Sequence, residues 1–142
     1  MAEDLEQFVG KWKLDRSENV EEFFKAMGMN FFLRKMASRA SPEQIVTRED
    51  NKLKIVIHTA FMTREDEVKL NEEYEKHDEK MGAKFKCKAR MEEGKLIVDQ
   101  ERIDGDGTTP PQIITREIIE GETVVIVKVG DVISKRWFKR LE

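Results

Sequence analysis

Two arginines occur within apolar runs near the C-terminus, and their role depends on whether their side chains point inward or outward. Arg116 lies between Ile114 and Ile118, and Arg136 comes two residues before Phe138. A guanidinium stays charged at neutral pH, and burying it is costly unless an anion reaches it. Inward side chains would therefore predict an interior anion site, whereas outward side chains would be ordinary solvated charges.

The runs that carry these arginines are predicted to be strands. Residues 112–119, 122–129 and 132–141 are short, rich in Ile and Val, and separated by glycine-containing turns, which is typical of consecutive antiparallel strands. Alternation leaves both directions open. Around Arg116, isoleucines occupy both faces, and in the last run Ile133, Trp137 and Leu141 make the face opposite Arg136 as apolar as its own. For Arg136, parity alone favours the outward direction.

Composition limits the class of protein. The chain has 142 residues, enough for one domain, which we place over residues 1–142. With 39% charged and 39% hydrophobic residues it is predicted to be globular, and a net charge of −3 argues against a nucleic-acid partner. The single cysteine, Cys87, excludes an internal disulfide. The acidic start MAEDLEQF lacks a signal-peptide core, and no run reaches roughly 18 apolar residues, so we expect a cytoplasmic protein.

Two helices are predicted after a first strand, which is marked by Phe8, Gly10, Trp12 and Leu14. Ser17 is the expected cap of the first helix, Gly28 its end, and its apolar stripe consists of Val20, Phe23, Phe24 and Met27. Asn30 is the expected cap of the second, and Ser41-Pro42 ends it. Its apolar side carries Phe32, Leu33, Met36 and Ala40, with Arg34, Lys35 and Arg39 elsewhere.

Everything after Pro42 is predicted to be strands joined by turns, with a long exposed loop at residues 104–111. The turn signals are Asp50-Asn51, Thr63, Asn71, Gly82, Glu93-Gly94, Gly105, Gly121 and Gly130. In residues 84–91, Phe85, Cys87, Ala89 and Met91 alternate with basic residues. Two of these four are small, which indicates space inside the sheet. Closure into a barrel would remove the unpaired edges of such a meander.

This order of elements resembles the intracellular fatty acid-binding protein family, the cytosolic lipid-binding proteins of the calycin superfamily. The resemblance extends over essentially the whole chain. It is carried by Phe8-x-Gly10-x-Trp12-x-Leu14, Ser17-x-Asn19, residues 19–42, His58-Thr59-x-Phe61, Gly94-Lys95-Leu96, Thr115-Arg116-Glu117 and Arg136-x-Phe138. It implies an all-β fold, a ten-stranded antiparallel up-and-down barrel around a cavity, with a two-helix lid between strands one and two.

The resemblance also implies a function and a ligand site. Many members hold a ligand carboxylate with two arginines and a tyrosine, which here correspond to Arg116, Arg136 and Phe138. Phenylalanine has no hydroxyl, so one hydrogen bond is lost and a water-mediated contact is the alternative. Arginine rather than the glutamine of retinol-binding relatives favours an acid. The expected function is binding and transport of long-chain fatty acids or similar lipid acids, with Ile55, Ile57, Val125 and Val127 lining the tail.

Ligand access is expected at the lid, where Phe61, Met36 and Phe24 would form the portal; ordinary core packing is the alternative for Phe61 and Met36. Lys25, Arg34 and Lys35 match a nuclear-import patch of some relatives, while basic lid residues in others assist contact with anionic membranes. A solvated face is the third interpretation. Delivery to membranes or a nuclear receptor, with a nuclear as well as a cytoplasmic location, is therefore an expectation for a monomeric carrier.

Other functions have weaker support in the sequence. A Cys87–His58 nucleophile pair would need both side chains inside, and the resemblance places His58 outside. The acidic run with Glu72, Glu73, Glu75, His77 and Asp78 lacks fixed metal-ligand spacing. We therefore expect no enzyme, no cofactor and no metal. The alternatives kept open are a protein-interaction module in which lipid acts as a switch, and a carrier of a retinoid-like acid.

Overall fold

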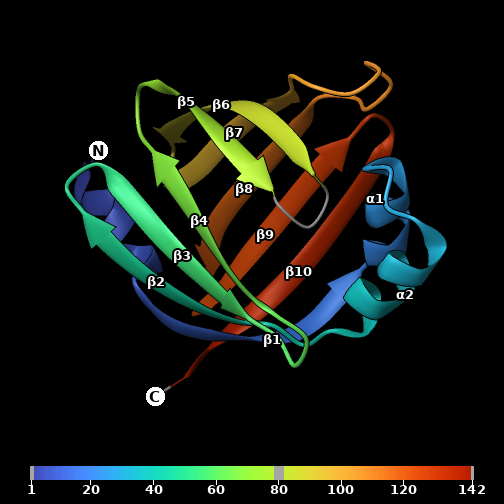
Figure 1. The fold of residues 1–142 in the computed structure, drawn as a ribbon. Helices are drawn as coiled ribbons and strands as arrows, with labels where there is room; N and C mark the ends of the chain where they lie inside the picture. The colour runs from blue at the N-terminus through green and yellow to red at the C-terminus, as the bar shows by residue number, and fades with distance from the viewer. Residues whose placement is uncertain (1, 79–81, 142) are drawn as a thin grey trace.

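Ten antiparallel strands wind into a barrel with two short helices across one end (Figure 1). In this computed structural model, which describes residues 2–78 and 82–141, the predicted fold class is confirmed. The elements are a 3-10 helix η1 (Ala2–Phe8), β1 (Gly10–Glu18), α1 (Val20–Ala26), α2 (Phe31–Arg39), β2 (Glu43–Glu49), β3 (Lys52–His58), β4 (Thr63–Lys69), β5 (Glu73–Asp78), β6 (Ala83–Glu92), β7 (Lys95–Arg102), β8 (Gln112–Ile119), β9 (Glu122–Val129) and β10 (Val132–Leu141).

The strands form a meander that almost closes. Strands β1 to β4 and β5 to β10 each pair in sequence order, and β1 pairs with β10, so the sheet order runs β4-β3-β2-β1-β10-β9-β8-β7-β6-β5. Within the described residues, β4 and β5 are not joined by a strand ladder, so closure by backbone bonds is incomplete there. Side chains span this seam instead. Arg64 Nη1 lies 2.9 Å from Asp78 Oδ2, and Lys76 Nζ lies 3.2 Å from Asp66 Oδ2.

The three C-terminal strands have the predicted bounds. Between β8 and β9, Ile119 is opposite Glu122, which leaves a two-residue turn. Both turn residues have positive φ, 51° for Glu120 and 81° for Gly121, as a type I′ hairpin turn requires. The turn fits the right-handed twist of its strands, so the register of this hairpin follows from local sequence.

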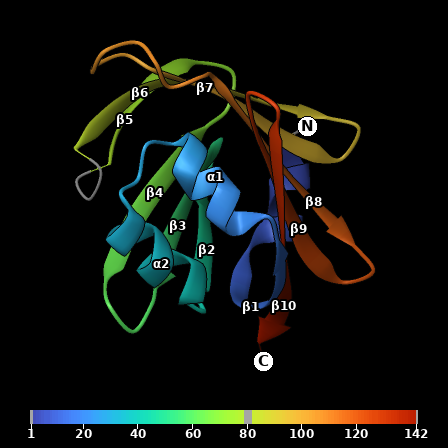
Figure 2. The same ribbon diagram turned by 90° about the vertical axis from the view of Figure 1, so that its right-hand side faces the viewer.

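The N-terminal residues differ from the prediction. Phe8 belongs to η1 rather than to the first strand, which begins at Gly10. Leu5 and Phe8 are fully buried, and Trp12 Nε1 donates to the Phe8 carbonyl oxygen at 2.9 Å. Figures 1 and 2 show η1 at the end of the barrel opposite α1 and α2. The short helix therefore plugs that end with apolar side chains.

The two lid helices begin differently. The prediction that Ser17 caps α1 is wrong, because β1 continues through Ser17 and the helix begins after Asn19. Asn19 has a φ of 59°, a left-handed conformation that asparagine tolerates, and its Nδ2 donates to the Ile133 carbonyl oxygen at 3.1 Å. The predicted cap of α2 is confirmed, since Asn30 Oδ1 accepts from the Leu33 backbone N–H at 2.9 Å.

The second helix is barely packed. None of its residues is buried, and Phe31 and Phe32 are 65% and 71% exposed. The apolar side predicted for this helix therefore does not pack onto the barrel, whereas Val20 at the start of α1 and Met27 at its C-cap are buried. In the part of the chain that the structure describes, no helix is long and apolar enough to cross a bilayer.

Candidate functional site

Strand register decides where the two arginines point. Residues directly opposite in an antiparallel pair share a face. Leu96 is opposite Arg116, Arg116 is opposite Val125, and Val125 is opposite Arg136. Leu96 and Val125 are buried in the core. Both arginines therefore face the barrel interior, on either side of Val125, which settles the alternative that parity left open.

Arg116 is buried and forms no ion pair with any of the described residues. Arg116 is 8% exposed, and its Nη1 donates to Gln44 Oε1 at 2.9 Å. Burial lowers the pKa of the guanidinium to about 10, an effect that the negative charge of Asp66 partly opposes. The group stays protonated at neutral pH. Among the described residues its hydrogen-bond partner is a neutral amide, so its charge is left uncompensated at contact distance.

Arg136 is partly buried beneath the lid. Its guanidinium carbon lies 5.6 Å from the centroid of the Phe24 ring on α1, within cation–π range. Burial, and secondarily the positive charge of Arg64, lowers the pKa of Arg136 to about 10. The described residues offer it no ion pair. Phe24, predicted as a portal or cavity residue, thus connects the lid helix α1 with this arginine.

Phe138 lies on the same inner face, two residues along β10 from Arg136. It is 1% exposed and is opposite Leu14 and Thr123. Its side chain contributes packing and offers no hydrogen-bond donor. Two interior charges with an apolar neighbour can attract an anion, but they do not provide a third donor from this position.

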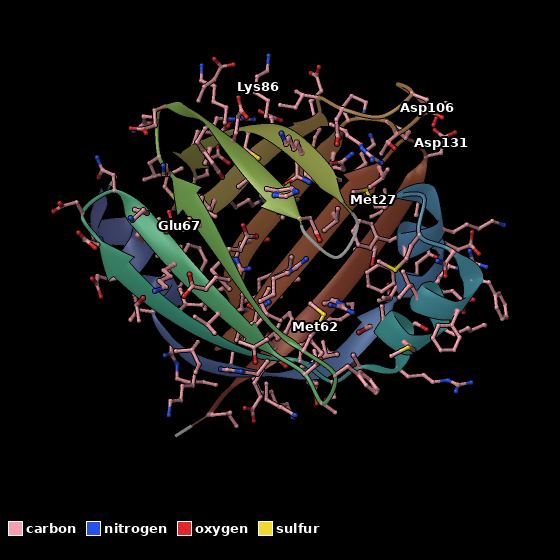
Figure 3. All side chains as sticks on the ribbon, viewed as in Figure 1. Met27, Met62, Glu67, Lys86, Asp106 and Asp131 are labelled. Atoms are coloured by element: carbon pink, nitrogen blue, oxygen red, sulfur yellow. The ribbon has the colours of Figure 1, made fainter. Side chains whose placement is uncertain are left out.

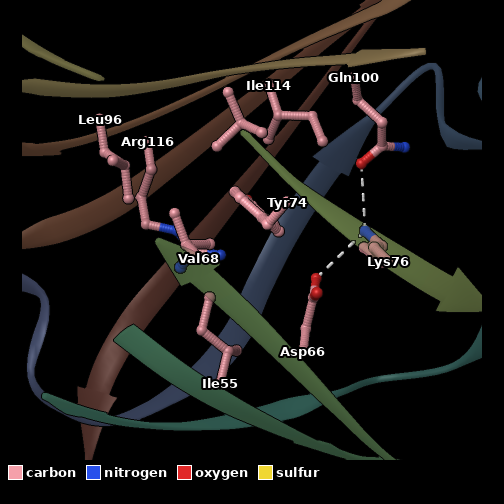
Figure 4. A pocket seen from close by; sticks show the side chains of 10 residues that line it. Ile55, Asp66, Val68, Tyr74, Lys76, Leu96, Gln100, Ile114 and Arg116 are labelled. Carbon is pink, nitrogen blue, oxygen red and sulfur yellow. Dashed lines mark hydrogen bonds and ion pairs between the residues drawn. The ribbon is translucent and has the colours of Figure 1, made fainter. Parts of the chain in front are cut away.

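A cavity lies inside the barrel beside Arg116 (Figure 4). Its volume is about 50 Å³, several times the roughly 10–15 Å³ that one water molecule needs. Ile55 lines it, Val125 is buried in the same core, and Ile57 and Val127 pack against that core. All four therefore lie on the inner side of the barrel, and their contact with a ligand tail stays a prediction. The lining residues of the cavity are Ile55, Asp66, Val68, Tyr74, Lys76, Leu96, Val98, Gln100, Ile114 and Arg116.

Three polar side chains of this lining were missed by sequence reasoning. Asp66, Lys76 and Gln100, hereafter the polar wall, meet across β4, β5 and β7. Lys76 Nζ lies 3.2 Å from both Asp66 Oδ2 and Gln100 Oε1. Residues 64–67 and 75–78 are polar on both strand faces, so alternation gave no signal. The inward face follows only from register, in which Asp66 is opposite Ile55.

Two of the predicted portal residues, Phe61 and Met36, line a groove at the lid, whereas Phe24 lies against Arg136. This groove of about 380 Å³ is lined by Phe31, Phe32, Lys35, Met36, Arg39 and Phe61. Phe61 and Met36 thus lie on the same groove, and its use as a ligand portal stays a prediction. Phe61 is 58% exposed, so ordinary core packing does not explain it. The groove combines exposed aromatic rings with two cations.

The basic residues of the lid share one carboxylate. Lys35 Nζ and Arg34 Nε lie 2.8 and 3.7 Å from Glu21 Oε1, and the hydrogen bond from Lys35 lowers the pKa of Glu21. Lys25 is exposed. Glu21 therefore offsets part of the positive charge that Lys25, Arg34 and Lys35 carry together.

The nucleophile pair is not assembled. His58 is opposite Glu43 and next to the inward Ile57, so it faces outward, and its Nδ1 lies 2.9 Å from Thr63 Oγ1. Cys87 is buried inside, where burial raises the pKa of its thiol. Over residues 2–78 and 82–141, no group of three or more His, Cys, Asp or Glu side chains could hold a metal ion.

Known proteins are similar to this chain in sequence and in fold. A profile of the lipocalin / cytosolic fatty-acid binding protein family matches residues 9–131. Sodium/calcium exchanger regulatory protein 1 of Doryteuthis pealeii is 32% identical over 142 residues, the whole of both chains. Cellular retinoic acid-binding protein 2 of Mus musculus is 32% identical, covering 96% of this chain and 99% of its own.

A solved structure of the REP1-NXSQ fatty acid transporter superposes with a TM-score of 0.86 at 31% identity, over 96% of this chain and 98% of that one. The last two are named for binding retinoic acid and for transporting fatty acids, and the matched family is one of fatty-acid binding proteins, not of enzymes. The chain therefore belongs to the lipocalin / cytosolic fatty-acid binding protein family.

Proposed function

We propose that this protein binds a long-chain fatty acid or a similar hydrophobic carboxylate, with its carboxylate at Arg116 and Arg136. The observation that carries this proposal is the pair of inward arginines, which have no ion-pair partner among the described residues. A carboxylate would supply the missing countercharge through charge-assisted hydrogen bonds. Phe138 offers no donor, so a water molecule would take the place of a third direct contact.

The acyl tail would supply most of the affinity. Each methylene removed from water contributes about 0.8 kcal/mol, and the interior offers Ile55, Ile57, Val125 and Val127. The cavity of about 50 Å³ is smaller than the roughly 300–1,000 Å³ of ligand pockets, so the barrel must widen on binding. The weakly packed α2 and the seam between β4 and β5 are the places where it can yield.

Access and delivery would occur at the groove between α2 and Phe61. Exposed Phe31, Phe32 and Phe61 can enter the interfacial layer of a membrane, while Lys35 and Arg39 attract anionic lipids. The groove therefore favours membrane contact over nuclear import. A nuclear-import patch would need the positive charge of Arg34 and Lys35, which Glu21 partly offsets. A cytoplasmic monomer fits this role, and nuclear delivery is a further proposal.

The arginines can be tested by Arg116→Gln and Arg136→Gln, which retain polarity and remove charge. Losing a charge-assisted hydrogen bond of about 1.5–3 kcal/mol would weaken palmitate binding about 10- to 100-fold in calorimetry. Affinity for hexadecanol, which lacks the carboxylate, would change little. Arg90→Gln is the matched control, because Arg90 lies outside on β6 in exposed pairs with Glu92 and Asp99. Unchanged palmitate affinity in both folded variants would contradict the proposal.

A second candidate is a lipid-dependent regulator of a membrane protein. It is favoured by the 32% identity, along its whole length, with a protein named for regulating a sodium/calcium exchanger. Native mass spectrometry and pull-down from membranes separate the two: a copurified lipid acid supports the carrier, and a partner retained only by the lipid-loaded form supports the regulator. Competition between palmitate and retinoic acid would test a retinoid-like ligand, suggested by the retinoic acid-binding relative.

A further inference from the structure

The barrel interior holds a second polar region, set apart from the two arginines. Arg116 and Lys76 lie on opposite sides of one cavity, with Tyr74 between them (Figure 4). Lys76 is held by Asp66 and Gln100, and Gln100 Nε2 donates to Gln112 Oε1 at 2.8 Å. A purely hydrocarbon tail would cover these groups without offering them a partner, and covering polar groups in this way is unfavourable.

We infer that the preferred ligand is a long-chain acid with a neutral oxygen part-way along its chain, a hydroxyl or keto group that Lys76 binds. The inference rests on the proposed function, since it takes the carboxylate to lie at the arginines. It assigns the polar wall of Asp66, Lys76 and Gln100 as a second subsite. It also names hydroxy and keto fatty acids as the preferred class of ligand.

The donor inventory supports a ligand oxygen at Lys76. A lysine ammonium has three N–H donors. Among the described residues Asp66 and Gln100 accept from Lys76 Nζ at 3.2 Å each, and the Phe85 ring centroid lies 5.9 Å away, so one N–H has no hydrogen-bond acceptor and can serve a ligand. The adjoining Gln100 also lines the cavity and is 5% exposed. A hydroxyl could accept from Lys76 and donate to Asp66 or Gln100, whereas a keto oxygen could only accept.

Charge decides against a second carboxylate. Asp66 lines the same cavity and keeps Lys76 in a contact pair, so the polar wall is close to neutral as a unit. An additional carboxylate beside Asp66 would face a like charge in a poorly solvated interior, which is strongly unfavourable. A neutral oxygen forms the hydrogen bond without that repulsion. The subsite therefore selects hydroxy and keto acids over dicarboxylic acids.

Register gives the approximate position of that oxygen. Arg116 and Gln112 lie on the same inner face of β8, four residues apart, which corresponds to about 13 Å of strand. Gln112 is opposite Gln100, the partner of Lys76. A long acyl chain that starts at Arg116 extends past this point. The oxygen is therefore expected near the middle of the chain rather than at its methyl end.

The first experiment uses the unaltered protein and three ligands. Stearic acid, a hydroxystearic acid with its hydroxyl at mid-chain, and the isomer with its hydroxyl at the chain end are titrated by calorimetry. We expect the mid-chain isomer to bind about tenfold more tightly than the terminal isomer, the effect of about one net hydrogen bond. Equal affinity of the two isomers would overturn the inference while leaving the proposed function intact if stearic acid binds.

The second experiment removes the polar wall without leaving an unpaired charge. Asp66→Asn/Lys76→Met neutralises both partners and nearly conserves volume. The preference for the mid-chain isomer should fall about tenfold, while stearic acid binds at least as tightly as before. Lys86→Met is the matched control, because Lys86 projects outward from β6 (Figure 3) and pairs with exposed Glu73. A preference unchanged in the double variant would overturn the inference. Failure of stearic acid to bind the parent protein would overturn the proposed function as well.

Discussion

Two sides of the barrel are held together by different forces. The wall formed by β8, β9 and β10 is a continuous ladder of paired strands, and it carries Arg116, Arg136 and Phe138 on its inner face. The seam between β4 and β5 has no such ladder within the described residues and is spanned by the Arg64–Asp78 and Lys76–Asp66 ion pairs. One side is fixed by backbone geometry and the other by charge.

The difference suggests a division of function. Backbone ladders fix side chains within narrow limits, so the wall can hold two guanidiniums apart around Val125 at a constant spacing. The Arg64 side chain is 38% exposed, so its ion pair with Asp78 can exchange with water, whereas the Lys76–Asp66 pair lies deeper. We therefore expect the head group of a ligand to meet a rigid wall, and the barrel to widen at the Arg64–Asp78 end of the seam.

The largest expected effect comes from the wall. Phe138→Ala removes an almost fully buried ring from the closing strand and should lower the free energy of unfolding by about 3–5 kcal/mol, because the surroundings cannot collapse into the space. Urea denaturation monitored by tryptophan fluorescence would measure it. Leu141→Ala, at the 38% exposed end of the same strand, should cost far less. Equal losses would show that this wall is not a tightly packed core.

Breaking the seam should cost less and act locally. Asp78→Asn removes the charged acceptor of Arg64 and should lower the free energy of unfolding by about 1–3 kcal/mol. Hydrogen exchange should accelerate in β4 and β5 and stay unchanged in β8 to β10. Asp99→Asn is the control, because its pair with Arg90 is exposed on the outer surface and contributes little. Uniform acceleration over all strands would contradict a separate, weaker seam.

The same contrast explains what could be predicted from sequence. On the wall, apolar runs and the Glu120-Gly121 turn determined the strand bounds, because local pattern and turn chemistry agree there. The directions of Arg116 and Arg136 did not follow from alternation, since both faces carry Ile or Trp. They required either the family resemblance or the pairing through Val125.

The seam could not be predicted, for a physical reason. Asp66, Lys76 and Asp78 are inward residues in strands whose outward residues are also charged, so hydrophobic periodicity is absent. Their pairing is between β4 and β5, which form no strand ladder over the residues that the structure describes. The predicted Ser17 cap of α1 was wrong for a similar reason, because Ser17 is held in β1 by its pairing with Arg136, a residue distant in sequence.

The smallest expected effect tests whether the buried polar groups of the wall have hydrogen-bond partners. Thr123 lies between Ile118 and Phe138 in register, is fully buried, and its Oγ1 has no hydrogen-bond partner among the described atoms. Thr123→Val replaces that hydroxyl with a methyl group of similar size, so the free energy of unfolding of the ligand-free protein should rise by about 1 kcal/mol. Thr115→Val, on the outer face of β8, should change it by less than about 0.5 kcal/mol.

A loss of stability in Thr123→Val would mean that the hydroxyl has a partner in solution, such as a water molecule held between the wall strands. The wall would then contain a buried water molecule and would not be held by backbone ladders and side-chain packing alone. Measuring fatty acid affinity in the same variant separates the two cases. If the hydroxyl is bonded only in the ligand-free protein, its removal should leave the affinity nearly unchanged. If it bonds to a bound carboxylate or to the water beside it, its removal should weaken binding, and Thr123 would then supply the donor that Phe138 lacks.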